Sequence, residues 1–326
     1  MSAFPTSIRR LVRYKVRMSS PSPQLDIPFE QTEPSTSTGV TQTLDRMRQR
    51  REQSAIAAGL PDWPENKRGL PNGALRSALF GISPKERRSY AFERHVASID
   101  GVEVFITRGP NLMQHHLDVW EQCLKLGKDQ GTGRRIEFTA YAFLKSIGRN
   151  TGKSDNEWLK NALYDLAACV VRISDGSKTY FGPLIHGGTR DELTGRYVIE
   201  INPKIALLYG SGQWTQLDYV QREKLRRHPL AQWLHAFYST HASPYRYRVE
   251  TIRRLCGADV EGELKKFRQV LRRALERLDV ATGWHWRIDE SDCVVLQKQP
   301  PSNGERGIVG TVSERVLSKE ASRATG

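Results

Sequence analysis

The sequence predicts an α+β protein in which two tandem winged-helix domains lie between flexible N- and C-terminal tails. Two observations support this fold class. Segments with apolar residues at every third or fourth position alternate with short runs rich in β-branched residues, which is typical of helices mixed with antiparallel strands. In addition, an order of helices followed by a two-stranded hairpin occurs twice along the chain.

Composition divides the 326-residue chain into five segments. The two ends are rich in Pro, Ser, Gly and charged residues, and such segments cannot bury enough apolar surface to become ordered. The middle of the chain has the apolar periodicity of packed helices and strands. We expect a flexible basic N-terminal region at 1–60, a linker or entry segment at 61–90, a first winged-helix domain at 91–212, a second at 213–298 and a flexible tail at 299–326.

In the first domain, helices and short strands alternate. Thr139 can cap the helix that follows it, and Ser154 with Glu157 fits the S-x-x-E capping box that starts a helix. Asp175-Gly176 and Gly187-Gly188 are expected to supply turns. The predicted strands are 102–107, 135–139, 170–173, 178–184 and 196–201, and the predicted helices are 111–126, 140–147 and the one that begins at Ser154.

The second domain repeats this plan without obvious sequence identity. Apolar periodicity predicts three helices, at 222–241, 249–256 and 261–278. Strands at 283–288 and 293–298 follow, joined by a turn at 289–292. Three helices and a hairpin in this order make a winged helix-turn-helix.

The helix at 261–278 carries the strongest functional signal. Its apolar residues form one stripe, while its other faces carry six bases against three acids. Such a helix can lay a basic, amide-bearing face into the major groove, where Arg and Gln pair with base edges and Lys neutralises phosphates. The competing interpretation is a solvated basic face. The candidate DNA-binding residues here are Lys265, Lys266, Arg268, Gln269, Arg272, Arg273 and Arg277.

Two further groups of residues are candidates for DNA contact. Arg246, Arg248, Arg253 and Arg254 lie just upstream and suit contacts to the DNA backbone that fix register. In the first domain the equivalent helix is less basic, and its outer face could instead meet solvent or a second protomer. Its candidates are Arg149, Lys153, Asn156 and Lys160.

Charge and composition narrow the class of partner. With 50 Lys and Arg against 36 Asp and Glu, the formal charge is +14, which favours nucleic acid first and an anionic membrane surface second. No run approaches the roughly 20 apolar residues of a membrane span. The four cysteines are widely spaced without a C-x-x-C pair, which indicates buried free thiols in the reducing cytoplasm.

The residues show no catalytic, metal or cofactor site. The histidines lie in different segments, with no nucleophile or carboxylate at motif spacing. The segment 148–154 resembles a phosphate-binding loop, but its glycines are one residue too close and it follows a helix. A nicking enzyme would need a His-apolar-His metal pair, which is absent, so Tyr245 and Tyr247 are read as loop aromatics that could stack on sugar or base.

A short peptide in the N-terminal region predicts a docking motif. Gln24, Leu25, Ile27 and Phe29 stand in a polar segment with no local core to join. A Gln, two aliphatic residues and a terminal aromatic on a flexible segment suit insertion into a hydrophobic pocket of a partner.

Several segments together resemble the TrfA family of plasmid replication initiators. The resemblance covers roughly residues 61–298, and its motifs occur in the right order. It is carried by Leu70–Phe80, His228–His241, Pro244-Tyr245, Leu255–Gly257 and Phe267–Leu278.

This resemblance implies two winged-helix domains that bind repeated sites (iterons) in double-stranded DNA at a plasmid origin. It further implies melting of a neighbouring A·T-rich region and loading of the host replicative helicase. Residues Gln24–Phe29 look like a six-residue version of the family's peptide for the polymerase sliding clamp, with Pro28 inserted before the aromatic. Family members commonly exchange between an inactive homodimer and an active monomer, with the interface in the first domain.

We therefore expect a non-enzymatic, origin-binding initiator without cofactors. The alternative is a winged-helix transcriptional repressor, which would make the same DNA contacts but would have no use for the clamp peptide. A nicking replication enzyme is a third hypothesis, and strand cleavage lost in Tyr245→Phe or Tyr247→Phe would support it.

Overall fold

The structure is a computed structural model that describes residues 46–47, 59–83, 90–99, 101–130, 134–176, 178–210, 212–259 and 262–298. The predicted peptide at Gln24–Phe29 and the predicted C-terminal tail lie outside these ranges. From residue 59 onward the described residues belong to one compact unit. Helices and strands are mixed, which confirms the predicted α+β class. No described helix is long and apolar enough to cross a membrane.

The first group of elements combines three helices with a three-stranded antiparallel sheet. The sheet has the order β6-β10-β9. Thr139 ends β6 and caps α4, because its side-chain oxygen accepts the amide of Ala142 at 3.2 Å, as predicted. The elements are α3 (Gln114–Asp129), β6 (Arg135–Thr139), α4 (Ala140–Ser146), α5 (Lys153–Ala168), β9 (Ile185–Arg190) and β10 (Arg196–Ile201).

A four-stranded antiparallel sheet is combined with this group. Its strand order is β3-β4-β7-β8, and in the sequence β7 and β8 lie between α5 and β9. The turn predicted at Asp175-Gly176 joins its last two strands. A short 3₁₀ helix, η2 (Pro203–Tyr209), lies next to β8. The strands are β3 (Tyr90–Val96), β4 (Glu103–Pro110), β7 (Val170–Ser174) and β8 (Thr179–Pro183).

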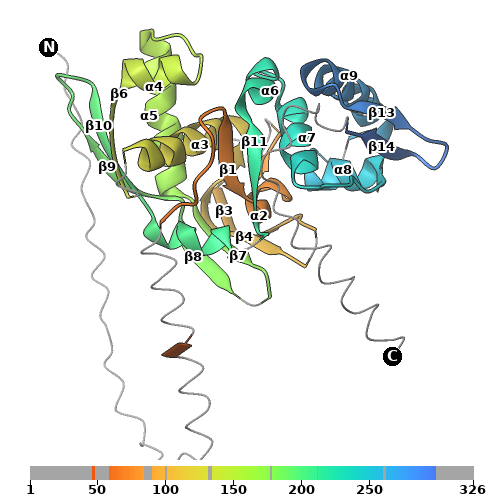
Figure 1. Cartoon of the computed structure of the whole chain (residues 1–326), viewed down its shortest axis with the longest axis horizontal. Helices are drawn as coiled ribbons and strands as arrows, with labels where there is room; N and C mark the ends of the chain where they lie inside the picture. The colour runs from red at the N-terminus through yellow and green to blue at the C-terminus, as the bar shows by residue number, and fades with distance from the viewer. Residues whose placement is uncertain are drawn as a thin grey trace, which may run out of the picture. The chain divides into compact units, whose positions relative to one another are not determined.

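The entry segment is packed into the fold. Strand β1 (Lys67–Pro71) runs antiparallel to β11 (Trp214–Asp218), about 150 residues later in the chain, and the two lie side by side in Figure 1. Helix α2 (Asn72–Leu75) follows, and β2 (Phe80–Gly81) pairs in parallel with β5 (Leu112–Met113). This two-residue pair is parallel, whereas the sequence pattern is typical of antiparallel strands.

The second group repeats the order of the first without the inserted strands. Its sheet has the order β12-β14-β13, in which the hairpin's last strand is central, as in β6-β10-β9. Figure 1 shows this group in cyan and blue. Its elements are α6 (Tyr219–Lys224), α7 (Pro229–Ser239), β12 (Tyr247–Arg248), α8 (Val249–Leu255), α9 (Leu264–Thr282), β13 (His285–Ile288) and β14 (Cys293–Gln297).

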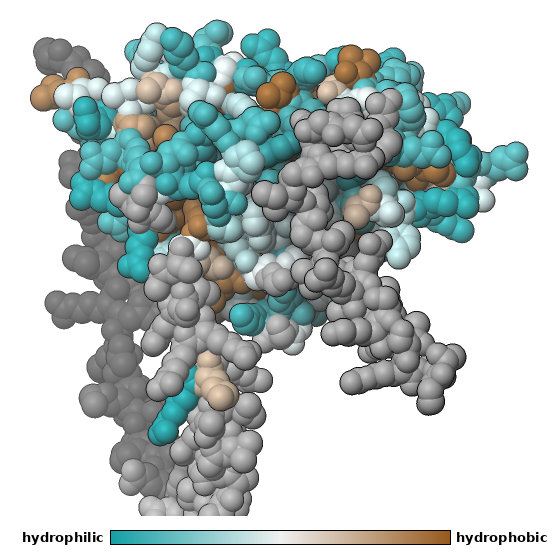
Figure 2. Space-filling model, viewed as in Figure 1, coloured by the Kyte–Doolittle hydropathy of each residue, from teal (hydrophilic) through white to brown (hydrophobic). Residues whose placement is uncertain are grey.

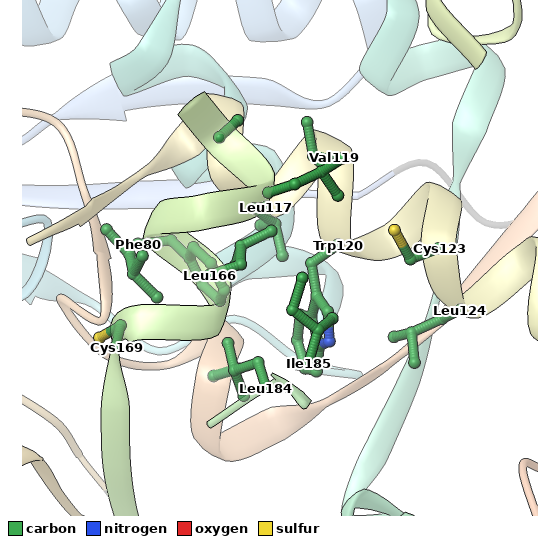
Figure 3. Packing of buried hydrophobic residues seen from close by; sticks show 14 of the residues in the cluster. Phe80, Leu117, Val119, Trp120, Cys123, Leu124, Leu166, Cys169, Leu184 and Ile185 are labelled. Carbon is green, nitrogen blue, oxygen red and sulfur yellow. The ribbon is translucent and has the colours of Figure 1, made fainter. Parts of the chain in front are cut away.

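Two apolar clusters form the core, one for each group. The first surrounds Trp120 of α3, and Figure 3 shows this ring among Leu117, Leu124, Leu184 and Ile185. The second is built around α7, α8 and α9 and includes Trp233, Leu271 and Leu275. Cys123, Cys169 and Cys256 are buried free thiols, as the sequence predicts, whereas Cys293 is a free thiol that is only partly buried. Burial raises the pKa of Cys169 and of Cys256 to about 12, so both stay protonated.

One predicted helix is interrupted. The segment predicted as a single helix at 222–241 forms α6 and α7, which are separated at 225–228. Pro229 is the first residue of α7, where its missing amide hydrogen costs nothing, whereas inside a helix it would break the ladder. Arg227 before it adopts a left-handed backbone with φ 69°. The prediction was wrong because it extended the apolar periodicity across this proline.

One predicted turn and one predicted helix cap are also wrong. Gly187-Gly188 lies inside β9, where a Cβ on Gly188 would meet the Val198 carbonyl oxygen at 2.1 Å. That glycine therefore permits close strand approach rather than a turn. The Ser154–Glu157 capping box does not form, because α5 begins at Lys153 with Gly152 as N-cap and no side-chain cap bond.

Candidate nucleic-acid interface

Helix α9 buries one apolar stripe and presents its other faces to solvent. Phe267, Leu271, Leu275 and Leu278 are buried against the second cluster, as the periodicity predicts. The helix continues to Thr282 and ends at Gly283, whose φ of 72° is the left-handed conformation that glycine adopts freely at a helix C-terminus. The predicted basic face is therefore on the outside of the fold.

Most of the predicted contact residues on α9 are exposed. The side chains of Lys265, Gln269, Arg272 and Arg273 make no hydrogen bond or ion pair with another residue that the structure describes. Lys266 is also exposed, with Glu263 at 3.7 Å. This face keeps the amide and guanidinium donors that base edges and phosphates accept.

Two predicted contact residues instead hold the β13–β14 turn. Arg268 donates from Nε and Nη2 to the two carboxylate oxygens of Asp292, both at 2.8 Å. This bond holds the pKa of Asp292 below its usual value. Arg246 donates to Asp289, whose Oδ1 also accepts the Ser291 and Cys293 amides at 3.0 Å. These two bases fix the hairpin beside α9.

Other predicted bases have local partners as well. Arg253 is buried, and its Nε and Nη2 donate to the Asp259 carbonyl oxygen at 2.9 and 2.5 Å. Its Nη2 also donates to the Gly262 carbonyl oxygen at 2.6 Å. These bonds stabilise the loop that connects α8 with α9. Arg277 reaches back to the His228 ring, with Nη1 at 2.7 Å from Nε2. Arg248 and Arg254 are exposed.

At the start of α5 the predicted residues are mostly engaged locally. Arg149 forms an ion pair with Asp155 at 2.9 Å and lies 3.7 Å above the Trp158 ring. Asn156 donates back to the carbonyl oxygens of Thr151 and Gly152, and Lys160 pairs with Glu157 at 2.7 Å. Lys153 is exposed. This helix therefore offers fewer uncommitted donors than α9.

Sequence reasoning missed one exposed base on the hairpin. Along β13, His285 and Arg287 point to solvent while Trp286 and Ile288 are half-buried. The alternation of polar and apolar residues in this strand was a usable signal for Arg287. Of the two tyrosines considered as nucleophiles, Tyr245 is exposed, and Tyr247 packs on Phe237 with its hydroxyl 3.2 Å from His241 Nε2.

A buried charged network connects α3 with α6 and α7. Arg222 donates to Asp118 from Nε at 3.0 Å and from Nη2 at 2.7 Å, and its Nε lies 3.2 Å from Glu121. Gln232 of α7 donates to the same Asp118 carboxylate. Burial raises the pKa of Glu121 to about 7, although the charge of Arg222 opposes that shift.

The loop at 148–152 lies beside this charged network. Arg226 donates from Nη1 to the Gly148 carbonyl oxygen at 2.8 Å. Gly148 has φ 60°, and a Cβ there would overlap the Arg226 guanidinium. This contact explains the glycine in the loop without a nucleotide.

The exposed surface is largely hydrophilic. Figure 2 shows teal residues over most of the face in view, with the hydrophobic ones scattered in small groups. Among the candidate DNA-binding residues in the described ranges, the exposed bases of α9 are therefore the group with the fewest local partners.

Comparison with known proteins gives a family, a protein of similar sequence and several similar solved structures. The plasmid replication initiator protein TrfA of Escherichia coli is 28% identical over 232 residues, which cover 66% of this chain and 58% of that protein. The chain thus spans less than two thirds of that relative. Among solved structures, domains 2 and 3 of RctB are similar at a TM-score of 0.47 and 14% identity, covering 69% of this chain and 95% of that one.

The Pi initiator protein, solved in complex with iteron DNA, is similar at a TM-score of 0.42 and 13% identity over 56% of this chain and 91% of that one. The model of the family described as TrfA protein matches residues 40–290, which is well over half of the sequence. The chain therefore belongs to the TrfA family.

Proposed function

We propose that this chain is a plasmid replication initiator that binds repeated sites, or iterons, at a replication origin. The observation that supports it most is the geometry of α9, whose apolar stripe is buried. Lys265, Gln269, Arg272 and Arg273 face solvent and form no hydrogen bond or ion pair within the described ranges. Because the chain belongs to the TrfA family, we infer that this basic helix binds DNA at a replication origin rather than any negatively charged polymer.

The two groups of elements are proposed to be tandem winged-helix domains. Apart from α6 in the second group and the inserted β7 and β8 in the first, each has a helix, a strand, two further helices and a hairpin. In each three-stranded sheet the last strand pairs with the other two. The boundaries proposed are 91–212 and 213–298, with 61–90 as the entry segment. The repeated order supports this assignment, because α5 and α9 then occupy the same place in their domains.

In the second domain α9 enters the major groove. Gln269 and Arg272 are assigned to base edges, since an amide and a guanidinium form paired hydrogen bonds with adenine and guanine. Lys265, Lys266 and Arg273 neutralise phosphates. Arg268 and Arg246 act through Asp292 and Asp289, which they hold in place, so the hairpin and its Arg287 flank the groove.

The first domain adds backbone contacts. Lys153 at the start of α5 is the exposed base that we assign to a phosphate there. Arg149 and Lys160 form ion pairs with Asp155 and Glu157, so we assign them to stabilising the start of α5 rather than to contacting DNA directly. The first domain is also proposed to carry the homodimer interface.

The remaining partners follow from the family. We assign the protein no enzymatic activity, a cytoplasmic location, recruitment of the host replicative helicase, and contact with the polymerase sliding clamp through Gln24–Phe29. Replacing Leu25 and Phe29 with Ala is expected to abolish clamp association and to spare DNA binding, as measured by surface plasmon resonance with purified clamp. Clamp association at the wild-type level would assign that contact to another segment.

A footprint of the purified protein on the DNA flanking its own gene tests the duplex contact. Gln269→Ala and Arg272→Ala should each weaken binding to the protected repeat by about 1–3 kcal/mol and relax sequence preference. Lys178→Ala, an exposed base on the β7–β8 turn, is the matched control. Unchanged affinity in both α9 variants would remove this helix from the groove. Unwinding of the bound origin separates an initiator from a repressor.

A further inference from the structure

The sheet of β3, β4, β7 and β8 has one face that is open to solvent and rich in aromatic rings. Its other face is buried, with Val104, Ile106, Val171 and Ile173 in the first apolar cluster. On the open face, large side chains are exposed instead: Tyr90 at 65%, Phe92 at 71% and Phe181 at 69%. A group of exposed rings on a sheet indicates a binding surface.

The strand register alternates these rings with cations. Phe92 of β3 lies opposite Arg108 of β4. Neighbouring strands are about 4.8 Å apart, so two rings on alternate strands are separated by roughly 10 Å. A second row crosses all four strands in the order His95, Phe105, Arg172 and Phe181.

The cations lie over or beside the rings. The Arg172 guanidinium is 4.2 Å from the centre of the Phe105 ring, and the centre of the His95 ring is 4.8 Å from the same point. Arg108 lies 6.0 Å from Phe92. Lys204, contributed by η2, lies 5.9 Å from Phe181. The rings are therefore held in a surface that also carries positive charge.

The acids of this face leave two of its cations uncompensated. Glu93 and Glu103 are exposed on β3 and β4, and Glu93 approaches Arg172 at 3.9 Å. Arg108 and Lys204 form no ion pair with any residue in the described ranges. These two cations stand beside Phe92 and Phe181, the two most exposed phenylalanines in the described ranges, so each ring has a neighbouring site for a phosphate.

We propose that this open face binds single-stranded DNA. Bases stack on aromatic rings whatever their sequence, and cations between the rings meet the phosphates that connect successive bases. A duplex hides the faces of its bases within its own stack, so these rings would have nothing to stack on there. The site is separate from α9, and only the choice of DNA over RNA rests on the proposed function.

The test is a Phe92→Ala/Phe181→Ala variant of the full chain. Its affinity for a fluorescent oligo(dT) of about 15 nucleotides, measured by anisotropy, should fall roughly tenfold or more, because each lost ring removes one stacking partner. Affinity for the duplex repeat should stay at the wild-type value, which also shows that the variant is folded. Arg108→Gln should weaken oligo(dT) binding and reduce its dependence on salt.

A matched control and a second variant separate the two sites. Tyr141→Ala removes a ring that is 60% exposed on α4 and should leave oligo(dT) affinity unchanged. Arg272→Ala should lose duplex affinity and keep oligo(dT) affinity, so a failure of the duplex contact is distinguishable from a failure of this site.

Three results would overturn the proposal. The first is wild-type protein that does not bind oligo(dT), or a double variant that binds it as tightly as wild type. The second is a changed elution volume in size-exclusion chromatography with unchanged oligo(dT) affinity, which would make the face a contact between copies of the chain. The third is tighter binding of oligo(rU) than of oligo(dT), which would assign the face to RNA.

Discussion

At the scale of single residues, the same basic side chain serves different ends according to its neighbours. Arg272 and Arg268 lie four positions apart on α9, yet Arg272 faces solvent and Arg268 is bound by both oxygens of Asp292. The sequence shows only that both are basic residues outside the apolar stripe. The partner of Arg268 comes from the β13–β14 turn, and no local pattern places that turn beside the helix.

The Arg268–Asp292 pair should contribute modestly to stability. Both side chains are about one third exposed, so solvent screens the pair. Arg268→Met and Asp292→Asn are each expected to lower the free energy of unfolding by about 0.5–1 kcal/mol. The double variant should lose no more than the larger single change, which urea denaturation of all four proteins would measure. Additive losses would show that the two side chains do not act as a pair.

Glu121 should make stability depend on pH. Its pKa is raised by burial to about 7 from 4.5, so the stability that its protonated form contributes is present below about pH 4.5 and lost as the pH rises through 7. Glu121→Gln keeps the shape and removes the charge, and should raise the free energy of unfolding at pH 8 by about 1–3 kcal/mol.

The measurement for Glu121 is urea unfolding at pH 5 and pH 8. Wild type should lose stability between these values relative to the Gln variant, since the other titrating groups are shared. If the two curves run parallel, then Arg222 keeps the Glu121 carboxylate charged and the burial cost is offset.

At the scale of elements, sequence periodicity predicted most helices and strands of both groups. α8, α9 and the β13–β14 hairpin lie within a few residues of their predicted ranges, because each has an unbroken pattern and a turn signal after it. The failures at Pro229 and Gly188 have a common cause. Each residue has two structural uses, and tertiary neighbours decide between them: Pro229 starts α7, and Gly188 lies against Val198.

Gly188 should be sensitive to substitution. A Cβ at this position would meet the Val198 carbonyl oxygen at 2.1 Å, so Gly188→Ala must displace strand backbone. We expect a loss of about 1–3 kcal/mol in the free energy of unfolding. Gly152→Ala is the control, because a Cβ there meets nothing within 4 Å and the backbone conformation is not left-handed. Equal stability of the two variants in thermal denaturation would contradict this account of β9.

At the scale of the whole molecule, long-range pairing was the part that the sequence could not supply. β1 and β11 are each five residues long, and nothing in either strand identifies the other. The exposure of the bases on α9 was easier to predict than the pairing of distant strands, because it follows from periodicity alone. Which bases remain uncommitted depends on partners such as Asp292 and Asp155, which only the folded chain brings near.

Duplex binding by the whole chain should fall steeply with salt. Each phosphate neutralised contributes about −0.9 to the slope of log affinity against log salt concentration. Lys266→Ala, at an exposed position assigned to a phosphate, should weaken binding to all sequences alike and reduce the magnitude of that slope by about 1. Titrations at several salt concentrations measure both effects. A slope equal to that of wild type would show that Lys266 does not contact a phosphate.

The pairing of β1 with β11 determines how the protein can be dissected. A fragment that begins at residue 91 would leave Trp214–Asp218 as a strand with unpaired amides and carbonyls, and would uncover the side chains that Leu70 covers. Such an open edge recruits strands from other molecules and promotes aggregation. Expression of a shortened protein should therefore retain Lys67–Pro71, so that β11 keeps its natural neighbour.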